Sequence, residues 1–397
     1  MEKSSGKVIE VIEVNNVRPK YRVLPPVPAL ILVLLLTAVV PSGPAWAKDG
    51  PAQALERGVA CLRTAEAREG YAPWTAVALR AAGHKAAPAP DTYLKSLAPD
   101  GPTTDYALAL LAVLAGGEDP AGPAATRLAA GLIRAQREDG KFADRIDGSG
   151  GELVNAHIWA VIALRAAGRE VPAAGKSREW LAARQHPDGG FSYAVNLPAS
   201  DVDMTAMALM AFAALGRGME DPAVGRALGY LRAVQSRATG GFGSWGLETT
   251  ADSCAVVILA LTALGEDPAG PNWSTAGGNP LTALFALQGR DGSFAYVAGQ
   301  EGNLMSTRQA VLALADHRAG RPFWERLAAG RPTGDVPAPA VRESGAGQAE
   351  AAPAGGGYAR LLPALLRAAA GLPGAGPFAL QAGIIIYASL LEEARER

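Results

Sequence analysis

The chain has 397 residues, of which 49% are hydrophobic and 19% charged, so it can bury a large core. Its 37 basic residues are balanced by 38 acidic ones, which excludes the basic surface that binding to a phosphate backbone needs. Aromatic residues make up only 6% while Ala and Leu dominate, which favours helices. The 47 glycines and 29 prolines exceed the usual share of roughly 12%, without reaching that of low-complexity disorder.

Residues 1–47 have the pattern of a secretory signal peptide. Basic residues at 18, 20 and 22 precede an uncharged apolar run over residues 27–40, and Ala45 and Ala47 are the small residues of a cleavage site. The alternative is an uncleaved N-terminal anchor, although fourteen apolar residues are short for a bilayer span. We therefore expect an exported protein in an oxidising compartment. There Cys61 and Cys254 can form one disulfide or remain two thiols.

Residues 52–329 contain a repeat of about fifty residues. Each repeat has a turn of the form Gln-x-x-Asp-Gly-x-Phe, or a close variant of it, between two helical patterns. The Asp-Gly pair predicts a tight reversal, and the Phe is expected to tuck between the paired helices. The four turns occupy residues 136–142, 185–191, 235–242 and 288–294.

Two degenerate units precede these four, which predicts six helix pairs. The second helix of each pair is apolar on nearly every side, as residues 206–215 and 256–264 illustrate, so it should be buried on every side. The first helices keep a polar face. These patterns predict an all-α fold, an (α/α)6 toroid with an inner ring of six apolar helices inside an outer ring of six. An open solenoid is the alternative.

Asn or Asp stands thirteen residues before the residue that ends each of the last four inner helices. Both types are favoured N-caps, so Asn155, Asp203, Asp252 and Asn303 are interpreted first as caps. In a ring of parallel helices the four would lie at one rim, with His157, Trp159 and Asp201 at a similar level, together with Asp105 and Trp74 from the early repeats. A polar rim above an apolar funnel is a candidate small-molecule or peptide site.

Beyond the repeats, residues 330–357 form a Pro/Ala/Gly linker without apolar periodicity, and residues 358–397 form a hydrophobic segment with a charged end. This segment is a candidate membrane or surface anchor. Residues 372–376, together with the apolar stretch and the charged tail after them, resemble a cell-wall sorting signal of the LPxTG type, except that Ala375 replaces Thr. A helix that packs on the toroid is the alternative.

The repeated turns between such helix pairs resemble those of the prenyltransferase/squalene-cyclase superfamily of α/α toroids. That superfamily contains both enzymes and binding proteins. In its class II terpene cyclases an Asp-x-Asp-Asp-Thr-Ala motif protonates the substrate. The matching run begins at Asp201, has Asp203 in the place of the general acid, and departs at Met204.

In protein prenyltransferases an Asp-x-Cys pair and a distant His hold zinc. Asp252 and Cys254 fit the pair, but the helix that should supply the histidine begins Asn303-Leu-Met-Ser-Thr. No metal site and no cofactor are therefore predicted. The exported, non-catalytic group that includes intrinsic factor and transcobalamin has similar inner-helix openings, and its resemblance implies a Cys61–Cys254 bridge.

The sequence thus predicts an exported, extracellular or cell-surface toroid that binds a small apolar or amphipathic ligand or a peptide in its central funnel, without catalysis and without nucleic acid. The rim candidates for this ligand are Asn155, His157, Trp159, Asp203, Asp252 and Asn303. One alternative is a class II squalene or terpene cyclase-like enzyme that uses Asp203 as general acid beside Asp201. The other is a scaffold without ligand.

Overall fold

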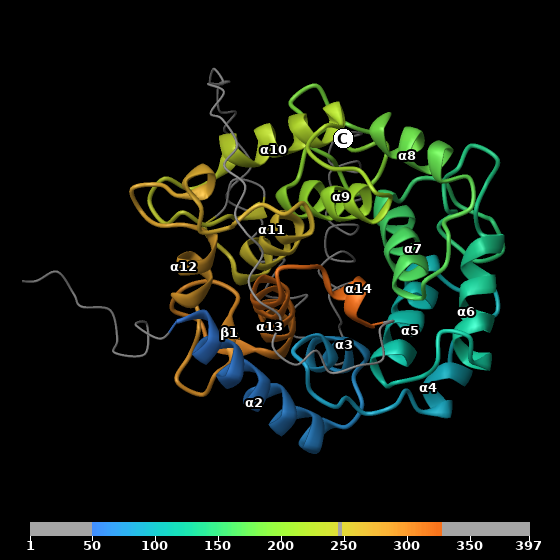
Figure 1. The fold of residues 1–397 in the computed structure, drawn as a ribbon, viewed down its shortest axis with the longest axis horizontal. Coiled ribbons are helices and arrows are strands. Elements are labelled where there is room, and N and C mark those ends of the chain that lie inside the picture. The colour runs from blue at the N-terminus through green and yellow to red at the C-terminus, as the bar shows by residue number, and fades with distance from the viewer. Residues whose placement is uncertain (1–49, 245–247, 328–397) are drawn as a thin grey trace, which may run out of the picture. The chain divides into compact units, whose positions relative to one another are not determined.

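The computed structural model describes residues 50–244 and 248–327. Within them twelve helices alternate between an outer and an inner ring, as Figure 1 shows, and this confirms the predicted all-α toroid. The outer helices are α2 (Pro51–Glu69), α4 (Asp91–Lys95), α6 (Pro123–Arg134), α8 (Ala174–Ala182), α10 (Pro222–Val234) and α12 (Pro280–Phe285). The inner helices are α3 (Pro73–Ala81), α5 (Thr103–Ala115), α7 (Val154–Ala166), α9 (Val202–Ala214), α11 (Ala251–Ala263) and α13 (Leu304–Ala319).

The inner ring closes because its last helix returns to the first pair. Each inner helix packs against the next, and α13 packs against both α2 and α3. Nearly every side chain of α7, α9 and α11 is buried, as the all-round apolar pattern predicted. Minor elements complete the described part: a 3-10 turn over Pro271–Trp273, and the antiparallel pair β1 (Phe294–Ala295) and β2 (Gly302–Asn303).

The glutamine of each repeated turn joins one repeat to the next. Its side-chain nitrogen donates to the carbonyl of the turn glycine and to a group on the next outer helix or, for Gln235, to the Trp273 carbonyl in the 3-10 turn before it. Gln185, for example, donates to Gly189 and to Ala223, both at 2.8 Å. In the last repeat Gln288 donates to Gly292 and, at 2.8 Å, to the carbonyl of Ala54 on α2. The same residue type therefore links consecutive repeats and also closes the ring.

The Asp-Gly pair of the turn has two separate physical roles. The Asp188 carboxylate accepts the Gly190 amide at 2.9 Å and holds the reversal, and Thr239 accepts the equivalent amide of Gly241 in the repeat that lacks the Asp. Gly189 has φ +91°, and a Cβ there would lie 2.4 Å from the carbonyl oxygen of Arg226. Only glycine fits this turn, because both the backbone angle and the close approach of the next outer helix exclude a side chain.

The phenylalanine of each turn is completely buried, and its amide is bound by the following inner helix. In every case the acceptor is the fourth residue of that helix, although its type changes from repeat to repeat. The acceptors are His157 for Phe142, Thr205 for Phe191, Cys254 for Phe242 and Thr307 for Phe294.

A further helix, α14 (Phe323–Leu327), lies inside the inner ring (Figure 1). Gly320 ends α13 in the left-handed conformation, and the chain then turns back toward the ring axis. Asp316 of α13 holds the returning segment: its carboxylate accepts the Phe323 amide at 2.9 Å and pairs with Arg326. The sequence pattern did not predict α14, since five residues are too few to show a helical period.

Three predicted segments lie outside the described residues: the signal peptide at 1–47, the linker at 330–357 and the hydrophobic segment at 358–397. Within the described residues, no helix is both long and apolar enough to cross a membrane.

Candidate functional site

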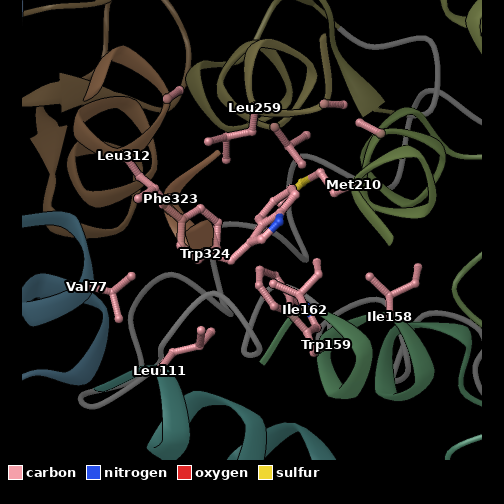
Figure 2. Close-up of a cluster of buried hydrophobic side chains, with 14 of the residues drawn as sticks. Val77, Leu111, Ile158, Trp159, Ile162, Met210, Leu259, Leu312, Phe323 and Trp324 are labelled. Carbon is pink, nitrogen blue, oxygen red and sulfur yellow. The ribbon is translucent and has the colours of Figure 1, made fainter. Parts of the chain in front are cut away.

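The second residue of each inner helix defines one end of the ring, which we call the mouth. Two turns further along five of these helices come Leu111, Ile162, Met210, Leu259 and Leu312, which point to the ring centre in Figure 2. Residues seven apart share a helix face, so the second residues face the same axis. The mouth residues are Trp74, Thr104, Asn155, Asp203, Asp252 and Met305.

The centre of the ring is occupied by α14. In Figure 2 the rings of Phe323 and Trp324 lie among residues of all six inner helices, from Val77 on α3 to Leu312 on α13. Phe323 is 0% and Trp324 3% exposed. The axis of the ring is therefore occupied by side chains of the protein itself.

The cap interpretation is correct for only one of its four residues. Asn303 is the N-cap of α13 and accepts the Ser306 amide at 2.9 Å. The other three stand at the second position inside their helices, and the caps of α9 and α11 are Asp201 and Thr250. The thirteen-residue count failed in α7, α9 and α11 because each has thirteen residues and the counted glycine lies two residues past its end, so the count falls on the second residue of the helix. In α13 the counted residue, Asp316, lies inside the helix, and there the count falls on the cap.

Asp201, Asp203 and Asp252 form an acidic cluster on two neighbouring inner helices. One oxygen of Asp201 accepts the Met204 amide at 2.9 Å, and one oxygen of Asp203 accepts the Ser244 hydroxyl at 2.9 Å. The hydroxyl oxygen of Ser244 lies 3.3 Å from that of Ser253, the residue after Asp252. Asp201 and Asp252 are each 3% exposed, whereas Asp203 is half-buried.

No basic side chain forms an ion pair with this acidic cluster among the described residues. The second oxygens of Asp201 and Asp203 and both oxygens of Asp252 accept no hydrogen bond there. Burial therefore raises the pKa of all three carboxyls, and the proximity of Asp203 adds to the rise for Asp201 and Asp252. For Asp252 the pKa reaches about 7, against the opposing influence of the Ser306 hydroxyl.

This pKa predicts a pH-dependent stability. Folded Asp252 keeps its proton up to about pH 7, while an unfolded aspartate loses it near pH 3.8, so the folded state binds more protons in this interval. The contribution to stability is complete below the lower value and is lost as the pH rises through the upper one. We expect the Asp252→Asn variant to melt several degrees above the parent at pH 8 but not at pH 4.5, by calorimetry. Exposed Asp267→Asn is the control; an equal shift at both pH values would contradict the prediction.

His157 lies away from the mouth, contrary to its place among the rim candidates. It is 0% exposed, and its Nδ1 accepts the Phe142 amide at 3.2 Å, so it is the acceptor that its helix gives to the repeated turn. Its ring packs on Trp180 of the outer helix α8 with centroids 4.9 Å apart. Burial, together with the charge of Lys141, lowers its pKa to about 3. A neutral, internal imidazole is a structural residue here.

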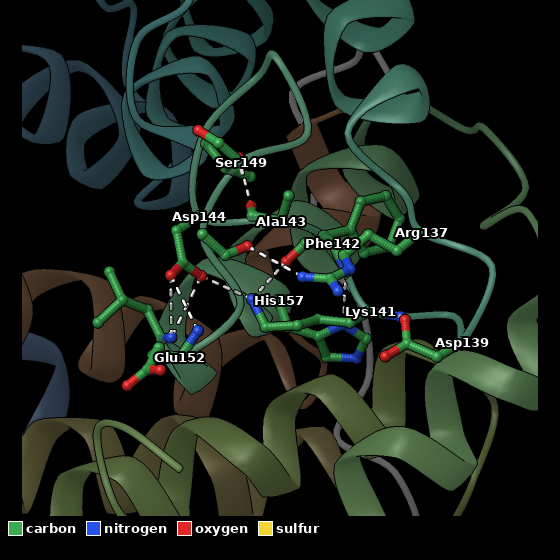
Figure 3. Close-up of polar contacts among 12 residues, drawn as sticks. Arg137, Asp139, Lys141, Phe142, Ala143, Asp144, Ser149, Glu152 and His157 are labelled. Atoms are coloured by element: carbon green, nitrogen blue, oxygen red, sulfur yellow. Dashed lines mark hydrogen bonds and ion pairs between the residues drawn. The ribbon is translucent and has the colours of Figure 1, made fainter. Parts of the chain in front are cut away.

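Close to His157, buried Lys141 and partly buried Asp144 hold the loop that leads to α7 (Figure 3). The Lys141 ammonium donates to Asp144 at 2.6 Å and to the Phe142 carbonyl at 2.9 Å. Asp144 in turn accepts the amides of Glu152 and Leu153, just before α7 begins. This network sets the start of α7, and with it the position of Asn155 at the mouth.

The cysteines do not form the bridge that the resemblance implied. Both are free thiols: Cys254 is buried in α11 beside Phe242, and Cys61 lies on α2 outside its buried face of Leu55, Val59 and Leu62. Burial raises the pKa of Cys254 to about 12, so it stays a neutral acceptor for the turn amide. The described residues contain no group of three His, Cys, Asp or Glu side chains arranged to hold a metal ion.

The part of the mouth formed by α3 and α7 is aromatic, and α13 adds a basic side chain. Trp74 and Trp159, the latter one turn below Asn155, meet edge to face with ring centroids 5.1 Å apart, although their helices are separated by α5. Arg308 of α13 donates through Nε to Thr75 at 2.7 Å, which directs it toward α3. Half-buried Asp105 lies on α5. The structure thus brings Asn155, Trp159, Asp203 and Asp252 together and separates His157 from them.

Sequence reasoning missed several residues of this site. Ser244 and Ser253 contact the acidic carboxyls, half-buried Met207 lies one turn below Asp203, and Phe323 and Trp324 fill the centre. The adjacent aromatic pair after the last inner helix was a usable signal, since aromatic residues are rare in this chain.

The helix arrangement and the repeated turn define an α/α toroid. The family model of the prenyltransferase alpha-alpha toroid domain matches residues 152–318, which confirms the predicted superfamily for this part of the chain. No curated protein matches the chain.

Two solved structures illustrate the likeness of fold. The type II terpene cyclase MstE from Scytonema has 15% identity and a TM-score of 0.48, over 68% of this chain and 99% of that one. Candida albicans protein geranylgeranyltransferase-I, complexed with GGPP, has 14% identity and a TM-score of 0.43, over 54% of this chain and 66% of that one. The chain thus spans just under two thirds of the transferase chain.

Proposed function

We propose that the toroid binds a small ligand with an apolar tail at its mouth, with the ligand's head group against Asp203 and Asp252 and without turnover. The observation that supports this most strongly is the position of Phe323 and Trp324, which occupy the ring centre and restrict a ligand to the mouth end. Export and surface attachment, which rest on residues 1–47 and 358–397, are part of the same proposal.

The mouth has the features of such a site. Asp203 and Met207 are half-exposed and one helical turn apart, so a polar and an apolar contact are offered side by side. Trp74 and Trp159 add a buried aromatic wall. A few polar groups above apolar walls are typical of small-molecule sites.

The acidic cluster also favours a second candidate, a class II terpene cyclase-like enzyme. Proton transfer to an alkene needs a carboxylic acid that stays protonated, and burial raises the pKa of Asp203 and Asp201, which favours that form. Met204 replaces the last acid of the motif, and α14 occupies the centre. For these two reasons binding without turnover is the better supported function.

Farnesol, a neutral isoprenoid alcohol, separates the two functions. We expect it to quench tryptophan fluorescence with saturation, and to be recovered unchanged by mass spectrometry. Met207→Trp should weaken binding at least tenfold by filling the mouth, whereas Met219→Trp on the exposed surface should not. A cyclised product that disappears in Asp203→Asn would establish the enzyme instead. If the folded protein binds neither farnesol nor farnesylamine, the remaining hypothesis is a scaffold without ligand.

A further inference from the structure

The acidic cluster has acceptors for hydrogen bonds but too few donors. Asp201 and Asp203 each have one oxygen, and Asp252 has two, with no donor in hydrogen-bond geometry within the described residues, although the hydroxyls of Ser244, Ser253 and Ser306 are close enough to lower the pKa of these carboxyls. Asp252 is 3% exposed, so bulk water does not satisfy it. Buried polar groups that are left unpaired are costly and rare, which indicates that something outside the chain supplies donors here.

The charge of the acidic cluster also indicates a ligand from outside the chain. The three carboxyls lie on α9 and α11 without an ion pair in the described part of the chain. The described groups that interact with them include the hydroxyls of Ser244, Ser253 and Ser306, the phenols of Tyr230 and Tyr296 and the thiol of Cys254, none of which carries a positive charge. On α13, Arg308 is held toward α3 by Thr75. A cation would therefore gain hydrogen bonds and charge compensation together.

The aromatic side of the mouth is a second, independent observation. Trp74 and Trp159 are 9% and 7% exposed, and their indole N–H groups have no acceptor among the described residues. Trp159 belongs to α7, the inner helix next to that of Asp203. An aromatic face near carboxylates is the usual surrounding of a bound organic ammonium group.

We propose that the mouth recognises a primary ammonium group on an apolar tail, bound by the carboxylates of Asp203 and Asp252. A primary ammonium has three N–H donors, which suits the unpaired oxygens of the cluster better than a quaternary ammonium without any. The proposal rests on ligand binding at the mouth and adds the chemical class of the head group. When the ligand binds, protonated Asp252 loses its proton to solvent, so binding is linked to the release of one proton.

The experiment compares three ligands with one tail: farnesylamine, farnesol and the N,N,N-trimethyl derivative of farnesylamine. Calorimetry of the full chain at pH 8 should give farnesylamine at least tenfold tighter binding than either of the others. Its dissociation constant should fall up to tenfold per pH unit between pH 5 and 7 and then level off. Titrations in two buffers of different ionisation enthalpy should show protons released at pH 6.

Variants place the effect on the cluster. Asp203→Asn and Asp252→Asn should each reduce the preference for the amine over farnesol to less than about twofold, with the circular dichroism spectrum of the parent. Asp267→Asn, the same charge change on the exposed surface, should keep the preference. Farnesol binding as tightly as the amine at pH 8, or a preference that survives both cluster variants, would overturn the proposal while leaving the proposed function intact. Failure of all three ligands to bind would overturn both.

Discussion

Replacing Trp324 with alanine is expected to lower the free energy of unfolding by about 3–5 kcal/mol, the usual cost of removing a buried large aromatic side chain. Trp324 is 3% exposed and lies at the ring centre among residues of the inner helices (Figure 2). The substitution would leave a large cavity, because the inner helices pack against their neighbours in a closed ring and cannot move in toward the axis. Urea denaturation followed by circular dichroism measures the change.

Two variants control this prediction. Trp324→Phe keeps an aromatic ring and should lose less than half as much stability. Met219→Ala, at a side chain that is 46% exposed, should change it by no more than about 0.5 kcal/mol. If Trp324→Ala costs less than about 1 kcal/mol, α14 does not fill the ring in solution, and the restriction of ligands to the mouth would have to be abandoned.

Gln288→Ala should cost on the order of 1–3 kcal/mol, because it leaves the buried carbonyl of Gly292 without its donor and removes the second hydrogen bond of the Ala54 carbonyl. Gln288 also accepts a hydrogen bond from Arg57 of α2. These contacts join the last repeat to the first across more than two hundred residues of chain. We expect the loss of stability to weaken the contact between α2 and the last repeat, because these hydrogen bonds hold the two together without a covalent bond.

Hydrogen exchange measures where the loss falls. In Gln288→Ala the amides of α2 should exchange at least tenfold faster than in the parent. In Gln185→Ala, which removes the equivalent contacts between two consecutive repeats, the amides of α2 should exchange as in the parent. Equal exchange of α2 in both variants would show that this glutamine does not close the ring.

The repeated turn made most of the fold predictable. Each of its residues makes a contact within the turn or with the next repeat, so the same residue types recur at the same spacing. Glutamine joins neighbouring repeats, aspartate holds the reversal, glycine is the only residue that fits its position, and phenylalanine is buried. Even the substitution of Thr239 for the aspartate keeps the acceptor that the turn requires. The apolar second helices likewise predicted the inner ring.

The candidate site was predictable only in part. Asp203 and Asp252 were chosen as caps, and the structure places them instead at the second position of their helices, at the mouth. The prediction failed because the glycines after α9 and α11 lie two residues past the helix ends, so a count of thirteen falls inside these thirteen-residue helices and not on their caps. His157 shares its helix with Asn155 but faces the turn, since residues two apart point in different directions on a helix.

By itself the sequence determined the class of fold, the number of helix pairs and the residues that each turn needs, because these depend on contacts within a repeat or between neighbours, at a regular spacing. Only the tertiary structure decided what lies on the ring axis. There, Trp74 reaches Trp159 past an intervening helix, and Trp324 enters from beyond the last repeat. Groups that meet across a closed ring have no fixed separation in sequence, so no period along the chain reveals them.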